Sequence, residues 1–470
     1  MTNLWDANAL AQEADAFIAA QKTALLCDIK TLVDIPSTDA PAKDGAPFGP
    51  GVAKALDAVL TLATDAGLDA HNVDGYFGYA DLRGKSKTQL AVITHIDVVP
   101  QGNGWTHDAF DMIEKDGYLL GRGVADDKGP AILTLYAAKF FAQRGVPLPY
   151  TLRLMFGTNE EKGMGGLTYY QQRFENPAFC FTPDADFPVC YGEKGIYGGN
   201  FISAPLCGNL IAFEGGMASN AVPDLAFAVV KADFAALRGA ASAAVTVQDA
   251  GDGCVRITCH GKGGHASLPD GTVNAIALVV DFLLAQQLCT ADETVFLRLL
   301  QTVLSSTDGS SAGIAAQDDI FTPLTCIGGT IAFADGVLTQ NINIRYPTGI
   351  TAQQITEKLE ALAATAGARF VPERETVPFV TSADTPMVQA LIETYNEVTG
   401  KHEKPFTIGG GTYARHFPSA VSFGPEEPGE TAPAWVGSMH GADEGISVAL
   451  LLRSLKIYIL GIARLMQLDF

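Results

Sequence analysis

His95 and Asp97 follow an apolar run at residues 90–94. One of them could bind a metal ion while the other orients the binding side chain. The run is typical of a buried strand. Side chains two apart on an extended strand share one face, with Cα atoms roughly 6.5–7 Å apart. His95 alone would more often be structural, and Asp97 alone could be a turn or cap residue. Their shared position favours the edge of an active site.

Four later clusters add side chains that are common metal ligands. They are Asp126 with Asp127, Glu160 with Glu161, Asp184 with Asp186, and Met439 with His440. Carboxylates and imidazoles suit several divalent ions, and a dinuclear site needs about this many ligands. One of the adjacent glutamates could bind a metal while the other transfers a proton.

Each cluster also has a structural interpretation. The pair at residues 126–127 could begin a helix, where acidic side chains are favourable, and such a carboxylate can still bind a metal. The glutamates at 160–161 could be a solvated charge pair. Asp184 and Asp186 follow a proline, as turn residues often do, and we expect only one of the two to be a ligand.

Two glycine-rich segments could contact a substrate. Residues 409–412 lack the lysine that would complete a phosphate-binding loop, so we predict a backbone-lined pocket for a substrate carboxylate that includes Gly410 and Thr412. The segment before His265, residues 263–264, could be only a turn or could position that histidine for function.

Alternating strand and helix patterns must position these clusters. Strands are expected at 89–94, 150–157 and 178–182, with a helix at 130–144. This alternation predicts an α/β fold with a mainly parallel central sheet flanked by helices. Ligands of such sheets bind beyond the carboxyl ends of the strands, where the acidic clusters lie.

A second domain is predicted to interrupt the first. The chain of 470 residues exceeds what one core usually supports. The acidic clusters stop after residue 194, and a mixed strand and helix pattern fills 195–380. We therefore predict a discontinuous catalytic domain at 1–194 and 381–470, with an inserted α+β domain at 195–380.

Composition excludes several classes of partner. The net charge of −21 disfavours nucleic acid and anionic lipid. The most apolar stretches are broken by charged residues, so we predict no membrane span. The eight cysteines form no Cys-x-x-Cys pair and are expected to be reduced. Residues 1–22 do not resemble a secretory signal, which predicts a cytoplasmic protein.

In combination, the motifs resemble a known enzyme family. They are His95-x-Asp97, Gly121-Arg122-Gly123-x-x-Asp126-Asp127-Lys128-Gly129, Asn159-Glu160-Glu161 and Met439-His440. In this order they resemble the dinuclear zinc peptidases and amidases that include carnosinases, aminoacylases and succinyl-diaminopimelate desuccinylase. The resemblance spans nearly the whole chain. Strings at 181–188, 192–195 and 215–223 look most like the PepV-type dipeptidases, and this implies a zinc-exopeptidase-like catalytic domain with a lid.

The resemblance implies a role for each cluster. One metal would be held by His95 and Asp184, the other by Glu161 and His440, with Asp126 bridging both. We choose Asp184 over Asp186 because it closely follows the predicted strand. Asp97 would orient the ring of His95, and Glu160 would be the general base that generates the attacking hydroxide. Zinc is implied as the metal, although manganese or cobalt would suit the same ligands.

The inserted domain is implied to contact the substrate. His265 and Asn220 would stabilise the oxyanion, and Arg345 would bind the terminal carboxylate of a small peptide. Because the large insert resembles a built-in substitute for a partner subunit, we predict a monomer. The expected activity is metal-dependent hydrolysis of unblocked dipeptides, which could include β-alanyl-histidine. The alternatives are an N-acyl amino-acid amidohydrolase and, more remotely, a non-catalytic metal-stabilised binding protein.

Overall fold

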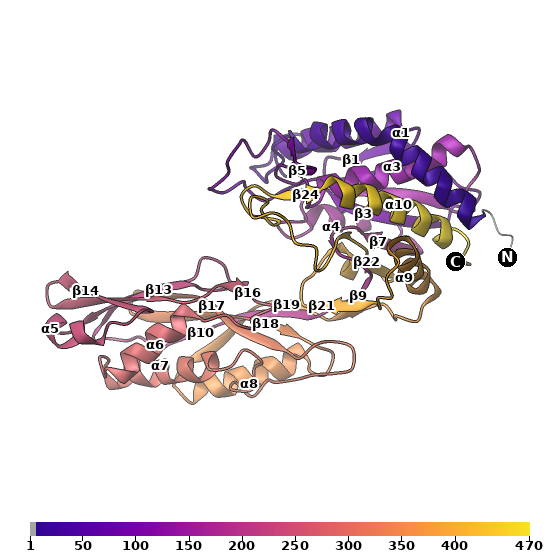
Figure 1. Cartoon of the computed structure of the whole chain (residues 1–470). Coiled ribbons are helices and arrows are strands. Elements are labelled where there is room, and N and C mark those ends of the chain that lie inside the picture. The colour runs from indigo at the N-terminus through magenta and orange to yellow at the C-terminus, as the bar shows by residue number, and fades with distance from the viewer. Residues whose placement is uncertain (1–5) are drawn as a thin grey trace. The chain divides into compact units, whose positions relative to one another are not determined.

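The computed structural model describes residues 6–470, which form two compact units (Figure 1). Within the described residues, unit 1 comprises 6–191, Val380–Phe406 and Gly411–Phe470, and unit 2 comprises Gly192–Phe379 and Thr407–Gly410. The segment 407–410 was predicted to lie in the catalytic domain. It belongs to unit 2 because the Lys194 amide donates to the Ile408 carbonyl and the Arg345 guanidinium donates to the Gly409 carbonyl.

Unit 1 is built on a nine-stranded mixed sheet with the order β1-β2-β6-β3-β7-β22-β9-β20, with β21 also paired to β9. The four strands β6, β3, β7 and β22 are parallel, which confirms the predicted arrangement for the centre of the sheet, whereas its flanks are antiparallel. The strands are β1 Asp69–Val73, β2 Phe77–Leu82, β3 Gln89–His95, β6 Thr151–Gly157, β7 Phe179–Thr182, β9 Cys190–Glu193, β20 Phe379–Val380, β21 Phe406–Ile408 and β22 Ala420–Ser422.

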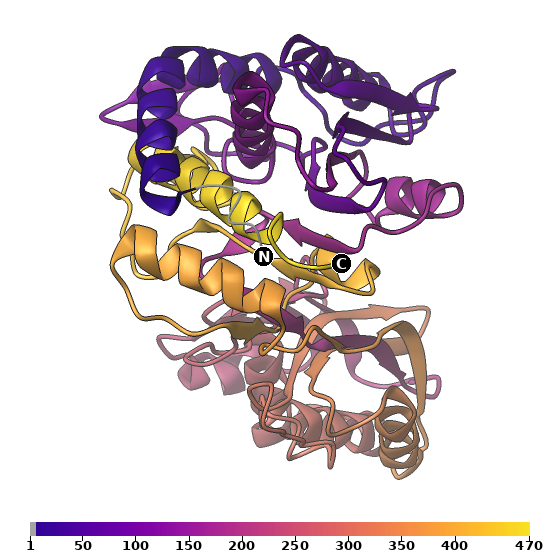
Figure 2. The same cartoon turned by 90° about the vertical axis from the view of Figure 1, so that its right-hand side faces the viewer.

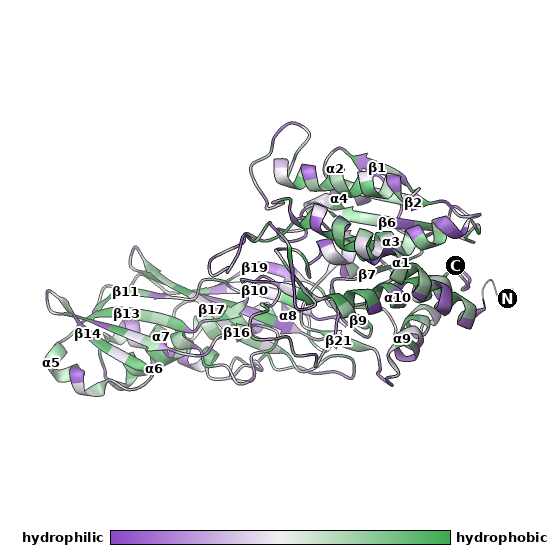
Figure 3. Cartoon of the chain, turned by 45° about the horizontal axis from the view of Figure 1, so that its top comes forward, coloured by the Kyte–Doolittle hydropathy of each residue, from purple (hydrophilic) through white to green (hydrophobic). Residues whose placement is uncertain are grey.

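Helices cover this sheet and bury the core of unit 1. The helices are α1 Ala7–Val33, α2 Pro50–Asp65, α3 Lys128–Arg144, α4 Gly165–Gln171, α9 Pro386–Thr399, α10 Val448–Leu465 and the short 3-10 helix η2 Tyr413–His416. Figure 2 shows α10 in yellow beside α9 in orange, and Figure 3 colours most of α10 as hydrophobic. Helix α3 is buried along most of its length, so its first residues are fixed against the sheet.

Unit 2 is an antiparallel sheet of eight strands with the order β14-β15-β13-β11-β17-β18-β10-β19. Its strands are β10 Gly195–Ile202, β11 Leu210–Gly215, β13 Leu225–Lys231, β14 Val245–Gly251, β15 Cys254–His260, β17 Thr325–Ala334, β18 Val337–Tyr346 and β19 Arg369–Thr376. Its helices are α5 Phe234–Leu237, η1 Arg238–Ala240, α6 Ala275–Ala285, α7 Ala291–Leu304 and α8 Ala352–Ala364. Apolar side chains from the sheet and from α6, α7 and α8 form one core, as the predicted α+β composition requires.

Short paired segments hold the loops that carry most candidate residues. In unit 1 they are β8 Ala185–Asp186 with β23 Pro425–Glu426, and β4 Ile113–Lys115 with β5 Tyr118–Leu120 and β24 Gly445–Ser447. In unit 2, β12 Ala221–Val222 pairs with β16 Gly264–His265. Across residues 6–470, no helix is both long enough and apolar enough to cross a membrane.

Candidate functional site

The end of strand β3 positions His95 in the interior of unit 1. Its backbone N–H donates to Asp127 Oδ2 at 3.0 Å. Its ring lies with Nδ1 2.9 Å from the carbonyl oxygen of Asp97 and Nε2 2.8 Å from Asp126 Oδ1. Three partners therefore fix the backbone and both nitrogens of this imidazole.

Asp126 lies between two imidazoles. Its Oδ1 faces His95, and its Oδ2 is 2.9 Å from His440 Nε2. The residue precedes α3, whose buried first turn fixes the backbone here. A carboxylate with one oxygen toward each histidine has the geometry expected of a ligand shared by two ions.

Five residues predicted as ligands come together in two groups that share Asp126. The groups are His95, Asp126 and Asp184, and Asp126, Glu161 and His440, and within each group the candidate ligand atoms lie within 4.8 Å of one another. Glu161 Oε1 is 3.1 Å from His440 Nε2, and Asp184 Oδ2 is 3.9 Å from His95 Nε2. Unit 1 thus contains two candidate metal positions side by side.

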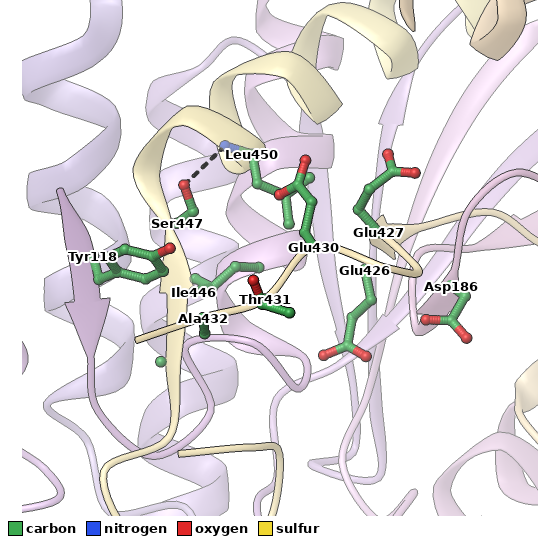
Figure 4. Close-up of a pocket in the computed structure, with 11 residues that line it drawn as sticks. Tyr118, Asp186, Glu426, Glu427, Glu430, Thr431, Ala432, Ile446, Ser447 and Leu450 are labelled. Atoms are coloured by element: carbon green, nitrogen blue, oxygen red, sulfur yellow. Dashed lines mark hydrogen bonds between the residues drawn. The ribbon is translucent and has the colours of Figure 1, made fainter. Parts of the chain in front are cut away.

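Asp186 lies elsewhere. It belongs to β8, whose register pairs it with Glu426 of β23. Both side chains line a separate pocket of about 290 Å³ that also includes Tyr118 and Leu450 (Figure 4). Of the two alternatives left open by the sequence, only Asp184 joins a candidate metal group.

Asp97 contacts the predicted histidine and two further partners. Its carboxylate accepts hydrogen bonds from the backbone N–H groups of Glu160, at 3.1 Å, and Glu161, at 3.2 Å. Its Oδ1 also lies 3.6 Å from His95 Nδ1, and its backbone carbonyl lies closer to that nitrogen, at 2.9 Å. The role of Asp97 in orienting the His95 ring stays a prediction, and its side chain also holds the backbone of the two glutamates.

The charges of this cluster fit divalent cations. Hydrogen bonds that the His440 ring donates to Asp126 and Glu161 raise the pKa of His440 to about 10. Burial and neighbouring carboxylates raise the pKa of Glu160 to about 8. Burial also raises the pKa of further carboxyls around it, namely Asp97, Asp127 and Asp184. Because so many carboxylates share a water-poor site, added positive charge would stabilise their ionised forms, and carboxylates with imidazoles are suitable donors.

Sequence reasoning missed Tyr413, which lies against the metal groups. Its ring is buried 6.5 Å from the His95 ring, centroid to centroid, and among residues 6–470 its hydroxyl has no hydrogen-bond partner. A Cβ on Gly157 would lie 2.0 Å from that hydroxyl, so only glycine fits at the end of β6. The only signal in the sequence was its position after the glycine-rich segment.

Unit 2 brings most of the predicted substrate-binding residues together. The His265 residue on β16 pairs with Ala221 on β12, and the Ala266 amide donates to the carbonyl of Asn220 at 2.9 Å. The His265 Nδ1 lies 2.7 Å from Ser267 Oγ. Asn220 and His265 are therefore fixed as neighbours by backbone pairing.

Arg345 and the glycine segment lie close to this histidine loop. The buried Arg345 side chain, on β18, donates to the Gly409 carbonyl and to Asn343 Oδ1, both at 3.0 Å. A Cβ on Gly409 would lie 2.6 Å from Ser267 Cβ, so this close approach requires glycine, and Gly410 follows it. Burial and the charge of Arg345 lower the pKa of His265, which keeps this imidazole neutral near pH 7.

Thr412 caps a short helix of unit 1, and its predicted contact with a substrate stays a prediction. Its buried hydroxyl lies 3.0 Å from Ser422 Oγ and accepts a hydrogen bond from the Ala414 amide, which makes it the cap of η2 in unit 1. A threonine at a helix start is often selected for this capping bond. The capping bond gives Thr412 a structural role.

The chain is similar to known proteins in both sequence and fold. The sequence profile of peptidase family M20/M25/M40 matches residues 91–464. YtjP of Bacillus subtilis (strain 168) is 32% identical over 461 residues, covering 94% of this chain and 97% of the relative. The Beta-Ala-Xaa dipeptidase of Lactobacillus delbrueckii subsp. lactis is 30% identical over 458 residues, covering 93% and 95%. The solved structure of the di-peptidase Dug1p from Saccharomyces cerevisiae has a TM-score of 0.64 at 13% identity, covers 98% of this chain and 99% of that chain, and shares the fold.

Proposed function

The chain belongs to peptidase family M20/M25/M40, and on that premise we propose that it is a metal-dependent dipeptidase that hydrolyses unblocked dipeptides. This membership agrees with the resemblance indicated by the motifs. The Lactobacillus relative named Beta-Ala-Xaa dipeptidase supports the substrate class. The observation that carries the proposal is Asp126, which lies between two imidazoles, with the half-buried Glu160 close enough to feel its charge.

The two groups that share Asp126 would hold two divalent ions. We assign His95 and Asp184 to one ion and Glu161 and His440 to the other, with Asp126 contributing one oxygen to each. Zinc is the ion we propose, and manganese or cobalt would suit the same donors. Bound ions would polarise the substrate carbonyl and lower the pKa of water.

Glu160 is the residue we assign to proton transfer. Its neighbour Glu161 belongs to a metal group, and both backbone N–H groups are held by Asp97, so the two side chains have separate tasks. A carboxyl with a raised pKa accepts a proton readily near neutral pH. Glu160 would take a proton from the attacking water and pass it to the leaving amine. Positive ions nearby would bring its pKa down toward the range of a working base.

The insert would bind the substrate. We propose that His265 and Asn220 donate hydrogen bonds to the oxyanion, since they are held as neighbours and the imidazole stays neutral. Arg345 would bind the terminal carboxylate, with the Gly409–Gly410 backbone beside it. The protein would act as a monomer that uses its own His265. A stable dimer in solution, measured by light scattering, would contradict this arrangement.

Hydrolysis by metal-stripped protein tests the proposal. The full chain is treated with a chelator and assayed on alanyl dipeptides, carnosine and N-acetyl amino acids, before and after zinc or manganese is returned. Metal-dependent cleavage of free dipeptides that disappears in Glu160→Ala is the expected result. Cleavage of only acylated amino acids would move the chain to the amidohydrolase branch. No cleavage of any substrate would contradict catalysis.

A further inference from the structure

One buried ion pair joins the two segments of unit 1 that carry Asp126 and His440. The side chains of Arg122 and Glu444 are each 1% exposed and form a salt bridge. We propose that this pair is a positioning element that sets the placement of His440 relative to Asp126 and thereby builds the second metal group. The inference rests on the proposed function because it concerns the ions that the reaction would use.

Glu444 fixes the backbone that presents Asp126. Its Oε1 accepts hydrogen bonds from the N–H groups of Gly123 at 3.0 Å, Ala125 at 3.1 Å and Asp126 at 3.4 Å. Its own carbonyl accepts from the Gly121 N–H at 2.9 Å. A single side chain therefore holds the whole turn that ends at the shared ligand.

Arg122 fixes the loop that presents His440. Its Nη1 bonds to Glu444 Oε2, while its Nη2 donates to the carbonyls of His440 at 3.2 Å and Gly441 at 3.1 Å. His440 has φ of 62°, a left-handed conformation that costs a residue with a side chain roughly 1–2 kcal/mol. The guanidinium therefore holds the two carbonyls that directly follow the unfavourable backbone bend.

The loop at residues 101–106 covers the ion pair of Arg122 and Glu444. Trp105 lies with its ring 5.3 Å from the Arg122 guanidinium carbon, and its Nε1 donates to the Gln101 carbonyl at 2.7 Å. Asp443 Oδ1 accepts from the Thr106 N–H and hydroxyl at 2.9 and 3.1 Å, which ties the cover to the His440 loop. An aromatic face over a guanidinium stabilises the charge where water is scarce.

The partners of this pair distinguish positioning from simple stabilisation. Breaking any buried pair leaves a charge without compensation and destabilises the chain. Here, however, the hydrogen bonds end on the backbone of two predicted ligands, and partners that orient ligands tune metal affinity. Arg153 and Asp81 provide a matched control, because they form a buried pair with side chains 7% and 13% exposed. The Arg153 guanidinium bonds to Asp81 and Tyr170, neither of which belongs to a metal group.

Two variants separate the components of the pair. Glu444→Gln keeps the shape and one oxygen for the backbone N–H groups but places an amide against Arg122. Arg122→Lys keeps the charge beside Glu444 but removes the fork that reaches the His440 loop. Arg153→Lys makes the same chemical change as Arg122→Lys in the control pair.

Stepwise binding of Zn²⁺ to the chelator-stripped full chain gives a readout independent of activity. In both site variants we expect the first ion to bind within about threefold of the parent and the second to bind about 10–100-fold more weakly. Cobalt titration should show an altered absorption spectrum only for the second ion. Arg153→Lys should lower the urea midpoint yet bind both ions as the parent does. With saturating zinc, kcat of the site variants should recover toward the parent value while KM stays within about threefold.

Each outcome decides the proposal. Two ions bound at parental affinity in Arg122→Lys would overturn it, and this variant decides the question if Glu444→Gln fails to fold. An equal loss of the second ion in Arg153→Lys would also overturn it, because a general stability effect would then explain the result. A parent that binds two ions but cleaves no dipeptide would contradict the proposed function alone, since the ion titration would still test the pair.

Discussion

The two candidate metal groups share Asp126 and use similar side chains, yet they differ in how they are held. In the first group the His95 side chain is 1% exposed and Asp184 is 15% exposed. In the second group the His440 side chain is 53% exposed. Closed sites usually hold an ion firmly, whereas catalysis needs an open position. A ligand at the end of a strand can therefore hold one ion firmly, while a ligand in a loop leaves the second ion accessible to solvent.

The contacts that fix the position of the histidine also differ between the two groups. His95 ends a seven-residue strand whose register with β6 and β7 is fixed by backbone pairing. His440 lies outside the named strands and helices, with a left-handed backbone and carbonyl contacts from Arg122. The first group therefore inherits its geometry from the sheet, and the second depends on side-chain contacts. We expect the second ion to be lost first when metal is withdrawn.

Removal of the shared ligand should abolish both positions. Asp126→Ala removes from both groups the carboxylate that they share, so both ions should bind weakly and kcat/KM should fall by more than about 100-fold, the loss that outer partners alone can cause. Metal analysis after dialysis measures the ion content. Asp186→Ala is the matched control, because Asp186 lines a different pocket, and it should retain two ions and activity. Retention of two ions in Asp126→Ala would contradict the shared geometry.

Replacing each histidine in turn should change the free energy of unfolding of the metal-free chain by different amounts. His95→Ala deletes a buried ring with partners on both nitrogens and should destabilise the metal-free chain by roughly 1–3 kcal/mol. His440→Ala deletes a half-exposed ring, so above pH 10, where the imidazole is neutral and its ion pairs with Asp126 and Glu161 are lost, it should change the free energy of unfolding by less than about 0.5 kcal/mol. Urea unfolding of the metal-free proteins measures both values. Equal destabilisation would show that burial does not distinguish the groups.

Asp97→Asn tests which group depends on this carboxylate. The asparagine keeps the backbone carbonyl that contacts the His95 ring but loses one of the two oxygens that hold Glu160 and Glu161. We expect the second ion to weaken by about tenfold and the first to change by less than about threefold. Calorimetric titration of the stripped protein distinguishes them. A selective loss of the first ion would support the prediction that Asp97 orients His95.

The sequence was informative where long apolar runs end in reactive residues. Strands expected at 89–94, 150–157 and 178–182 match β3, β6 and β7 within one residue at each end, because continuous burial leaves a clear signal. The resemblance named five ligands, and the structure places them in two groups. The strand pattern could not show that Asp97 also holds Glu160 and Glu161, because β3 ends at His95 and those contacts come from the loop beyond it.

Long-range partnerships could not be predicted from the sequence. Arg122 belongs to the motif at residues 121–129, but its partner Glu444 lies 322 residues away and no local pattern connects them. Tyr413 reaches the site only because Gly157 leaves room for its hydroxyl. The 407–410 segment belongs to unit 2 through bonds that its carbonyls accept from the Lys194 amide and the Arg345 side chain, both far away in sequence. Such contacts are properties of the packed chain, and the sequence shows only that the residues are compatible with them.

The pH dependence of the stability of the metal-free protein should show the smallest effect of all. His440 has a pKa near 10, raised from 6.5 by Asp126 and Glu161, so its contribution is complete below pH 6.5 and is lost as pH rises toward 10. Burial raises the pKa of Glu160 from 4.5 to about 8, so folding retains a proton that the unfolded chain releases, and stability falls across that interval too. Urea midpoints should therefore decline from pH 5 to pH 10 in the stripped protein. Glu160→Gln should flatten the decline below pH 8 and His440→Ala the decline between pH 6.5 and 10, because each removes one titrating group. A midpoint that rises over this range would show that neither group holds the proton that its surroundings favour.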